Sequence, residues 1–343
     1  MAQTARLRHI LKRRKEMNFL YFLEKIRNPV FDFFFSTVTH LGEELFFLAL
    51  AIIFFWCIDK YRGYYILMIG LLGTVVNQWL KIVCRVPRPW VNDPGFTTVM
   101  DAQAEASGYS FPSGHTQNIA GTFGAIGATS KRRWLSIVCI VIIVLVAFSR
   151  MYLGVHTPAD VFVSLLVAAA LLAILYPVFS SKERFDKYMP YVVGVAVLIT
   201  IGFFVYVNLL NPADYAADIT VNADGEIHDP LASALKNAAT MLGCMLGLLV
   251  VYPLDRFVIK FETKAKWYAQ IIKLALGLAI VLGIKSGLSK PLVSLFGNEL
   301  VARSVRYFLI VVFAGTIWPM TFKFFSKMSI PALDNLFKKK NKT

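Results

Sequence analysis

Three short charged motifs lie between strongly apolar segments of this chain. Charge is costly in hydrocarbon, so ionisable side chains in such surroundings are by default a functional hypothesis. An oxyanion such as phosphate needs several charge-assisted donors and a group that handles protons. The motifs offer both, because together they supply three cations, two histidines and one carboxylate: Lys81, Arg88, Arg150, His115, His156 and Asp160.

The first two motifs are expected at helix ends. Lys81 and Arg88 are seven residues apart, about two helical turns, so both point from one face. A snorkelling lysine and a boundary arginine would explain that pair alone, but the neighbouring motifs favour a site. Ser113 and Gly114 precede a segment rich in small residues, where a helix N-terminus offers free N–H groups to an anion. Ser113 is also suited to cap that helix.

The third motif has two compatible interpretations. Thr157, Pro158 and Asp160 are the residue types expected at the N-cap, first and third positions of a helix with a capping box. Asp160 also follows His156 by four residues and is placed to orient its ring, like the third member of a nucleophile or base arrangement. Arg150, six residues before the histidine, favours the second role beside the first.

The composition is that of an integral membrane protein. Of the 343 residues, 57% are hydrophobic and mean hydropathy is +0.59, whereas soluble domains average about 45–50% apolar residues. The net charge of +15 falls in short runs that are typical of cytoplasmic loops, so no nucleic-acid partner is expected. The four cysteines lack metal-ligand spacing, and we expect no metal and no other cofactor.

The elements that position the motifs are expected to be membrane-spanning helices. A span needs about 20 mostly apolar residues, with latitude for tilted or buried helices. The sequence therefore predicts an all-α, polytopic transmembrane bundle of about nine spans. These are residues 44–58, 64–84, 116–129, 134–152, 159–179, 190–210, 232–253, 267–284 and 301–322.

Lysine and arginine set the expected orientation. With the basic run 131–133 inside, all three motifs meet at the outer face, and other basic runs fall inside too. Residues 19–41 either cross as a tenth, poor span or lie flat at the interface, which their mixed composition favours. The expected parts are a basic N-terminus with an interfacial helix (1–43), a core carrying the motifs (44–180), additional transmembrane helices (181–326) and a basic cytoplasmic tail (327–343).

In order and spacing, the motifs resemble those of the type 2 phosphatidic acid phosphatase superfamily, which includes lipid phosphate phosphatases, undecaprenyl diphosphate phosphatases and glucose-6-phosphatases. The resemblance covers roughly residues 19–179 and implies a six-helix core. It implies that His156 attacks phosphorus to form a phosphohistidine, that Asp160 holds its ring and that His115 protonates the leaving oxygen. The implied phosphate-binding residues are Lys81, Arg88, Ser113, Gly114 and Arg150.

The spans beyond the resembling half carry further cations on the outer side. Arg303 and Arg306 are three residues apart on one helix face and are candidates for contact with a second phosphate or an anionic head group. The plainer interpretation is that Arg303 pairs with Glu299 at i, i+4 spacing.

Three functions stay open at this point. The leading one is a metal-independent phosphatase of the cell membrane, with its site on the extracytoplasmic face, that hydrolyses a lipid phosphate or diphosphate. Undecaprenyl diphosphate and phosphatidic acid rank highest as substrates, and phosphoryl transfer suits the cations because it relies on positioning and electrostatics. The alternatives are a lipid phosphotransferase of the same family and a lipid transporter or translocase. The last is disfavoured because the motif-bearing half has no visible counterpart.

Overall fold

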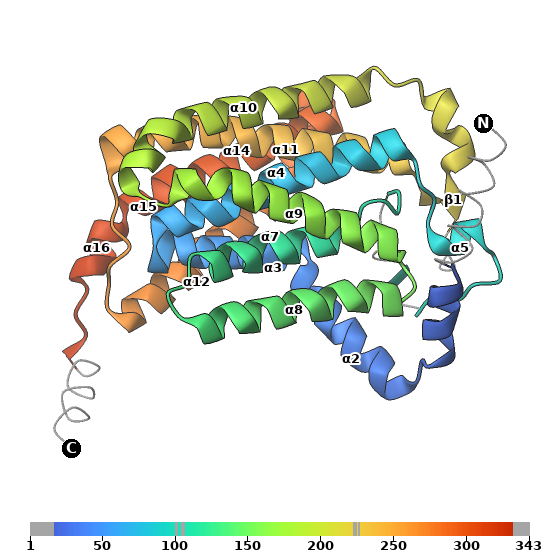
Figure 1. The fold of residues 1–343 in the computed structure, drawn as a ribbon. Helices are drawn as coiled ribbons and strands as arrows, with labels where there is room; N and C mark the ends of the chain where they lie inside the picture. The colour runs from blue at the N-terminus through green and yellow to red at the C-terminus, as the bar shows by residue number, and fades with distance from the viewer. Residues whose placement is uncertain are drawn as a thin grey trace.

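The protein is a bundle of long, roughly parallel and antiparallel helices (Figure 1). The computed structural model describes residues 17–331 except 100, 101, 104, 105, 107, 222–224 and 226. The predicted all-helical class is confirmed. The two described strands, each of two residues, pair with one another. The basic runs 6–15 and 338–340 lie outside the described residues.

The chain builds the bundle in two parts. The elements of the first part are α2 (Pro29–Thr39), η1 (His40–Gly42), α3 (Glu44–Ile53), η2 (Phe54–Ile58), α4 (Lys60–Cys84), α5 (Pro89–Asn92), α7 (Gly114–Ala128), α8 (Arg133–Tyr152) and α9 (Pro158–Phe179). The elements of the second part, called the extension below, are α10 (Lys182–Asn208), η3 (Pro212–Asp218), β1 (Thr220–Val221), β2 (Ile227–His228), α11 (Pro230–Pro253), η4 (Leu254–Ile259), α12 (Trp267–Gly287), α13 (Ser289–Phe296), α14 (Glu299–Val312), η5 (Phe313–Ile317), α15 (Trp318–Met320) and α16 (Phe322–Lys327).

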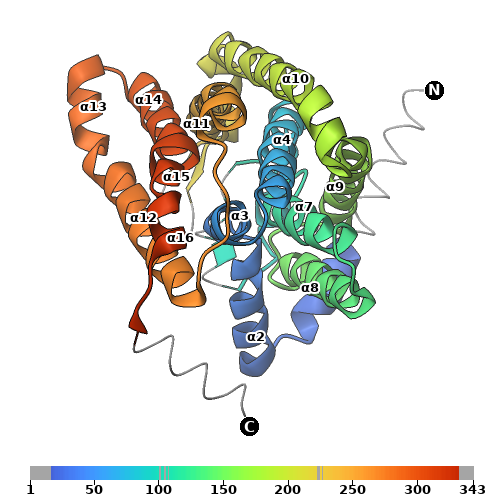
Figure 2. The ribbon, with the colours of Figure 1, turned by 90° about the vertical axis from the view of Figure 1, so that its left-hand side faces the viewer.

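Fewer helices than predicted are long enough to cross a membrane. Among the described residues, seven helical stretches are long and apolar enough, and the α2–α3 pair, bent by 52°, would make an eighth. The two predicted spans that fall short alone are α3 and α7. With 15 residues α7 is about 22 Å long, less than the about 30 Å hydrocarbon core. Its neighbours explain this, because α3, α4, α8 and α9 surround it (Figure 2).

Small residues let α7 sit at the centre of the first part. A Cβ added at Gly121 would come within 2.7 Å of Ile69 on α4, and one at Gly124 within 2.4 Å of Leu172 on α9. Both neighbours therefore approach the α7 backbone more closely than a larger residue would allow. The helix that carries the second motif is thus held from two sides.

The helix ends that carry the motifs gather at one end of the bundle. The α4 helix ends at Cys84, where Arg85 adopts a left-handed conformation with φ of 47° and prolines follow. The starts of α7 and α9 and the end of α8 lie at this same end, on the right of Figure 1. We call it the motif end, and the basic run 256–266 lies at the opposite end.

The extension packs tightly both within itself and against the first part. Ser304 Oγ on α14 donates to Ala239 O on α11 at 2.9 Å. Where α3 ends, Trp56 Nε1 donates to Ala314 O of the extension at 2.9 Å. At the end opposite the motifs, Lys60 Nζ lies 3.0 Å from Asp255 Oδ1, joining α4 to η4. The two parts therefore form one packed bundle.

The contact between α11 and α14 depends on Gly243. A Cβ there would lie 2.1 Å from Ser304 O, so the Gly243→Leu variant must push the two helices apart. We expect a loss of about 1–3 kcal/mol of stability, as for other overpacked sites, measured as a lower thermal midpoint in detergent. The Gly283→Leu variant on α12 is the control, because nothing lies within 4 Å of its added Cβ. Equal midpoints for the two variants would contradict this packing.

Candidate functional site

His156 lies in the turn between α8 and α9 with its ring nitrogens in distinct surroundings. Arg88 Nη1 is 3.0 Å from Nε2. A guanidinium only donates, so Nε2 accepts and the ring proton resides on Nδ1. That Nδ1 lies 3.4 Å from Asp160 Oδ2. The lone pair of Nε2 therefore points toward Arg88, on the side of the site where the cations lie.

Asp160 both caps its helix and faces the histidine. Its Oδ2 accepts from the Thr157 backbone N–H at 2.8 Å, and Thr157 Oγ1 accepts from the Asp160 N–H at 3.3 Å, which confirms the capping box. The same Oδ2 accepts from Ser110 Oγ at 2.5 Å and faces His156 Nδ1. The capping interpretation of the third motif therefore holds, and the position of the carboxylate beside His156 is compatible with the second interpretation, which remains a prediction.

The three predicted cations are buried around this pair, with Lys81 6%, Arg88 4% and Arg150 0% exposed. Buried charge needs polar partners, and neutral oxygens from loops and neighbouring helices supply them. Arg88 donates to Gly108 O at 3.1 Å and to Val155 O at 3.0 Å. Lys81 Nζ donates to Tyr109 O, and Arg150 Nη1 donates to Thr39 Oγ1 at 2.7 Å.

The second motif forms the start of α7 and joins the third. Ser113 Oγ accepts from the Thr116 N–H at 3.4 Å, which confirms the predicted cap. The Ser113 N–H donates to Asp160 O at 3.2 Å, and Ser164 Oγ on α9 donates to Ser113 O at 2.9 Å. The first N–H groups of a helix have no partner within it, so this end is suited to an anion.

His115 completes the cluster from the first turn of α7. Its Nε2 is buried, and no described residue makes a hydrogen bond to it. The side chains of Arg150, Arg88 and Lys81 lie close enough for their positive charges to act on its imidazole. The structure thus brings the predicted residues of all three motifs to one place.

Several contacts at the site were missing from the sequence prediction. Thr39 and Gly42 come from the α2–η1 segment, and a Cβ added at Gly42 would lie 2.9 Å from His115 Cβ. Asn77 Nδ2 donates to Pro112 O at 3.4 Å. Asn77 precedes Lys81 by one helical turn, so its polar type was a usable signal. Ser110 lies in a loop, and no local pattern marks it.

The extension also reaches the motif end, through its loop between α10 and α11. Arg85 Nη2 lies 2.7 Å from Asp218 Oδ2, and Tyr109 OH donates to the same carboxylate. The ring of His228 lies 3.0 Å from Ala106 O through Nε2. A cavity of about 210 Å³ is lined by Arg85, Arg88, Tyr109, Asp218 and His228 among others. The loop therefore borders the approach to Arg88.

Burial lowers the pKa of His156 below its usual value, and the positive charges of Arg88, Arg150 and Lys81 lower this pKa further. Burial and the adjacent Asp218 carboxylate raise the pKa of the Tyr109 phenol. At neutral pH His156 is therefore an uncharged imidazole and Tyr109 an uncharged phenol. An uncharged imidazole retains the electron pair that a nucleophile needs.

Arg303 and Arg306, the predicted second anion contact, lie on α14 in the extension. Arg303 Nη2 is 3.5 Å from Glu299 Oε1, so the plainer i, i+4 pair is present. The Arg306 guanidinium lies 5.6 Å from the ring centre of Tyr307. Among the described residues, no hydrogen bond, ion pair or aromatic contact joins either arginine to the three motifs. The second contact remains a prediction.

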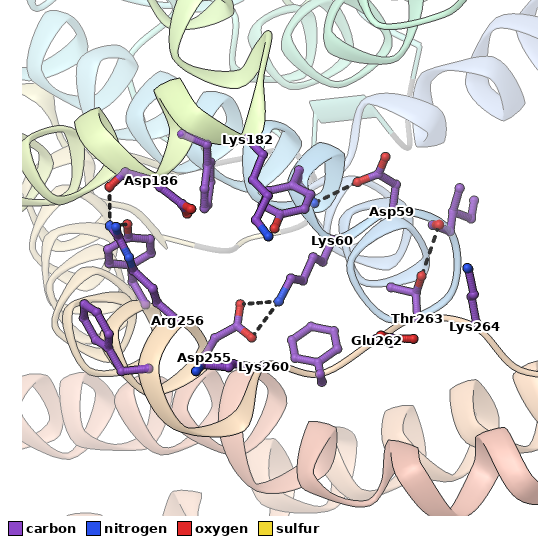
Figure 3. A pocket seen from close by; sticks show the side chains of 16 residues that line it. Asp59, Lys60, Lys182, Asp186, Asp255, Arg256, Lys260, Glu262, Thr263 and Lys264 are labelled. Atoms are coloured by element: carbon purple, nitrogen blue, oxygen red, sulfur yellow. Dashed lines mark hydrogen bonds and ion pairs between the residues drawn. The ribbon is translucent and has the colours of Figure 1, made fainter.

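A larger hollow, of about 720 Å³, lies at the end opposite the motifs (Figure 3). Some of its charged side chains bind one another or backbone atoms. Asp255 accepts from Lys60, and Arg256 donates to Asp186 O, as Figure 3 shows. No histidine is among the described residues that line it. The hollow offers no nucleophile or proton-transfer group comparable to those at the motif end.

Comparison with known proteins places the chain among membrane phosphatase relatives. The PAP2 superfamily matches residues 62–184, and the transmembrane extension of PAP2 superfamily phosphatases matches residues 239–329. Sphingosine-1-phosphate phosphatase 1 of Mus musculus is 26% identical, with 78% of this chain and 62% of the relative covered. A probable sphingosine-1-phosphate phosphatase of Dictyostelium discoideum is 31% identical, with 47% and 42% covered. The chain therefore spans less than two thirds of these relatives' own lengths.

Phosphatidylglycerophosphatase B of Bacillus subtilis is covered more completely. It is 31% identical over 147 residues, which are 40% of this chain and 69% of the relative. The two matched family segments lie on either side of the α10–α11 loop, so the predicted core and the predicted additional helices each have a counterpart in one family. The chain belongs to the PAP2 superfamily.

Proposed function

We propose that this protein is a membrane phosphatase that hydrolyses a lipid phosphate through a phosphohistidine on His156. The observation that carries the proposal is the state of this imidazole. Nε2 is held as an acceptor by Arg88, Nδ1 faces Asp160, and three buried cations surround the ring. An uncharged nucleophile within a cationic cluster is what attack on an anionic phosphoryl group requires.

In the first step the phosphate displaces Arg88 from Nε2, and Nε2 forms a bond to phosphorus as the bond to the lipid oxygen breaks. Lys81, Arg88, Arg150 and the start of α7 stabilise the charge on the phosphoryl oxygens. The ring gains positive charge, which Asp160 offsets from the Nδ1 side. The negative charge of the bound phosphate favours a protonated His115, which gives this proton to the departing lipid oxygen, so the lipid leaves as an alcohol.

In the second step water releases the phosphate. His115, now uncharged, takes a proton from a water molecule whose oxygen attacks phosphorus opposite Nε2. The bond between phosphorus and Nε2 breaks, inorganic phosphate leaves, and both histidines return to their starting states. Each step uses positioning and charge, which fits a site built from cations and a helix N-terminus.

The relatives favour a lipid phosphate monoester as the substrate. Two are named for sphingosine-1-phosphate and one for phosphatidylglycerophosphate. None of these names supports undecaprenyl diphosphate, which ranked highest from the motifs together with phosphatidic acid. We also propose that the motif end faces away from the cytoplasm, because the basic runs 131–133, 182–187 and 256–266 lie at the opposite end.

The test of the proposal is inorganic phosphate release by the purified protein from sphingosine phosphate, phosphatidylglycerophosphate, phosphatidic acid and undecaprenyl diphosphate. We expect release from at least one monoester in the presence of EDTA, since the cations take the role of a metal. The His156→Ala variant should lose at least about 10³-fold, as expected for a removed nucleophile. Undiminished release by this variant, or release that depends on added Mg²⁺, would refute the mechanism.

A comparison of two aspartates can distinguish helix capping from a role in catalysis. Asp160 belongs to the capping box of α9, and Asp229 is the N-cap of α11, where it accepts from the Ala232 N–H at 2.9 Å. Asparagine caps as well as aspartate, so Asp160→Asn should fold normally but lose the charge beside His156. We expect about a 10²-fold or larger fall in kcat for Asp160→Asn and no change for Asp229→Asn. Similar kcat values for the two variants would mean that Asp160 only caps.

The charges near His156 also predict a pH dependence. Because the pKa of His156 is lowered, its ring is still uncharged at pH 6.5, the ordinary histidine pKa. The acid limb of kcat/KM should therefore lie below about pH 6.5. In Arg88→Gln a positive charge is lost, the pKa of His156 rises, and the acid limb should move to higher pH. Arg88→Lys keeps the charge and should leave the limb near its original position. An acid limb at the same pH in both variants would contradict the assignment.

A further inference from the structure

An apolar cavity of about 440 Å³ lies between the first part and the extension. It is separate from the hollows described above and from the three motifs. Ligand cavities in proteins commonly measure about 300–1,000 Å³. Its walls come from α3, α4, α11, α12 and α14, and include Leu48, Ile52, Leu67, Leu248, Leu278 and Ile310.

The cavity is open near the motif end and closed at the other. Leu45 and Leu282, which line it on α3 and α12, are 57% and 56% exposed. At its far end Phe55 and Tyr64 are 4% and 1% exposed. Tyr64 OH donates to Asp255 at 3.3 Å, which fixes this floor to the Lys60–Asp255 pair seen in Figure 3. A closed floor suits a bound chain better than a passage across the membrane.

The polar side chains of the cavity gather mainly at its mouth. Glu44 and Lys285 lie at the ends of α3 and α12 that face the motif end, and Tyr307 is on α14. No described residue makes a hydrogen bond or an ion pair with the Glu44 carboxylate. The walls between mouth and floor are almost entirely hydrocarbon. This distribution matches a molecule with one polar end and one long apolar chain.

The mouth lies close to the catalytic cluster. Glu44 follows Gly42 by two residues, and a Cβ added at Gly42 would touch His115. In an in-line reaction the leaving oxygen lies opposite the attacking atom. With His156 attacking and His115 protonating, the lipid leaves on the His115 side, toward η1 and the start of α3.

We propose that this cavity holds the hydrocarbon chain of a single-chain lipid phosphate while its phosphate occupies the catalytic cluster. The inference rests on the proposed function and assigns the extension a role in substrate choice. From Glu44 to Phe55 the α3 wall rises about 17 Å. Half of the about 30 Å hydrocarbon core is about 15 Å, so the cavity is as deep as one leaflet is thick. A long chain therefore fills it, and a short chain reaches only its mouth.

Two cavity-filling variants test the proposal from opposite walls. Ala49→Trp on α3 and Leu278→Trp on α12 each place a large ring in the cavity. Ile280→Trp is the matched control, because Ile280 is 40% exposed on α12 and does not line the cavity. The measurement is KM and kcat for octadecyl phosphate and for its octyl analogue in mixed detergent micelles.

Both cavity variants should raise KM for octadecyl phosphate by about tenfold or more, because a hydrophobic pocket discriminates strongly by chain volume. They should leave kcat and KM for the octyl analogue unchanged, which also shows that the variants fold. The control should behave like the wild type with both substrates.

Other outcomes are distinguishable. Equal changes for the two chain lengths would mean that the substitutions disturb the catalytic cluster itself, and no change for either would mean that the cavity holds only a bystander lipid. Both results would overturn the chain-binding role while leaving the phosphatase proposal standing. If the wild type hydrolyses neither phosphate, the proposed function is wrong and the cavity proposal falls with it.

Discussion

The structure at the motif end depends on how it accommodates buried positive charge. Lys81, Arg88 and Arg150 are almost fully enclosed, and an enclosed cation without polar partners would be prohibitively costly. Their described partners include backbone carbonyl and hydroxyl oxygens from the 108–110 loop, the α8–α9 turn and the end of α2, and His156 Nε2 in the case of Arg88. These segments must therefore converge on one place, and helix ends are where the backbone offers spare oxygens.

Asp160 makes several of the contacts that hold these segments together. One carboxylate oxygen accepts two hydrogen bonds that fix the start of α9 and the 108–110 loop, and it also faces His156. The group that faces the ring is thus one that the fold already requires. Because Arg88 donates to Nε2, the ring proton resides on Nδ1, the nitrogen nearer Asp160.

The extension contributes to the motif end as well as to the bundle. Its α10–α11 loop contacts Arg85 and Tyr109, and α3 lies between α7 and the apolar cavity. Residues 239–329 match the transmembrane extension of PAP2 superfamily phosphatases. The α10–α11 loop and α3 therefore connect the extension physically to the motif end.

Many features of this protein can be predicted from its amino-acid sequence alone. The three motifs, the helix caps at Ser113 and Thr157, the helical class and the extra spans follow from local spacing and hydropathy, which depend on neighbours within a few residues. The resemblance to the superfamily also lay in those motifs. The catalytic and phosphate-binding roles of the motif residues remain predictions, as does the second anion contact of Arg303 and Arg306.

Other features arise from contacts between distant segments, which no local pattern encodes. Thr39 binds Arg150 across more than one hundred positions, and Ser110 reaches Asp160 from a loop. The number of long spans fell from nine to seven or eight because α7 is surrounded by other helices and need not match the bilayer thickness, and because α3 is short and bent against α2. The apolar cavity exists because five helices stand side by side, and that arrangement follows from packing, which is a property of the assembled bundle.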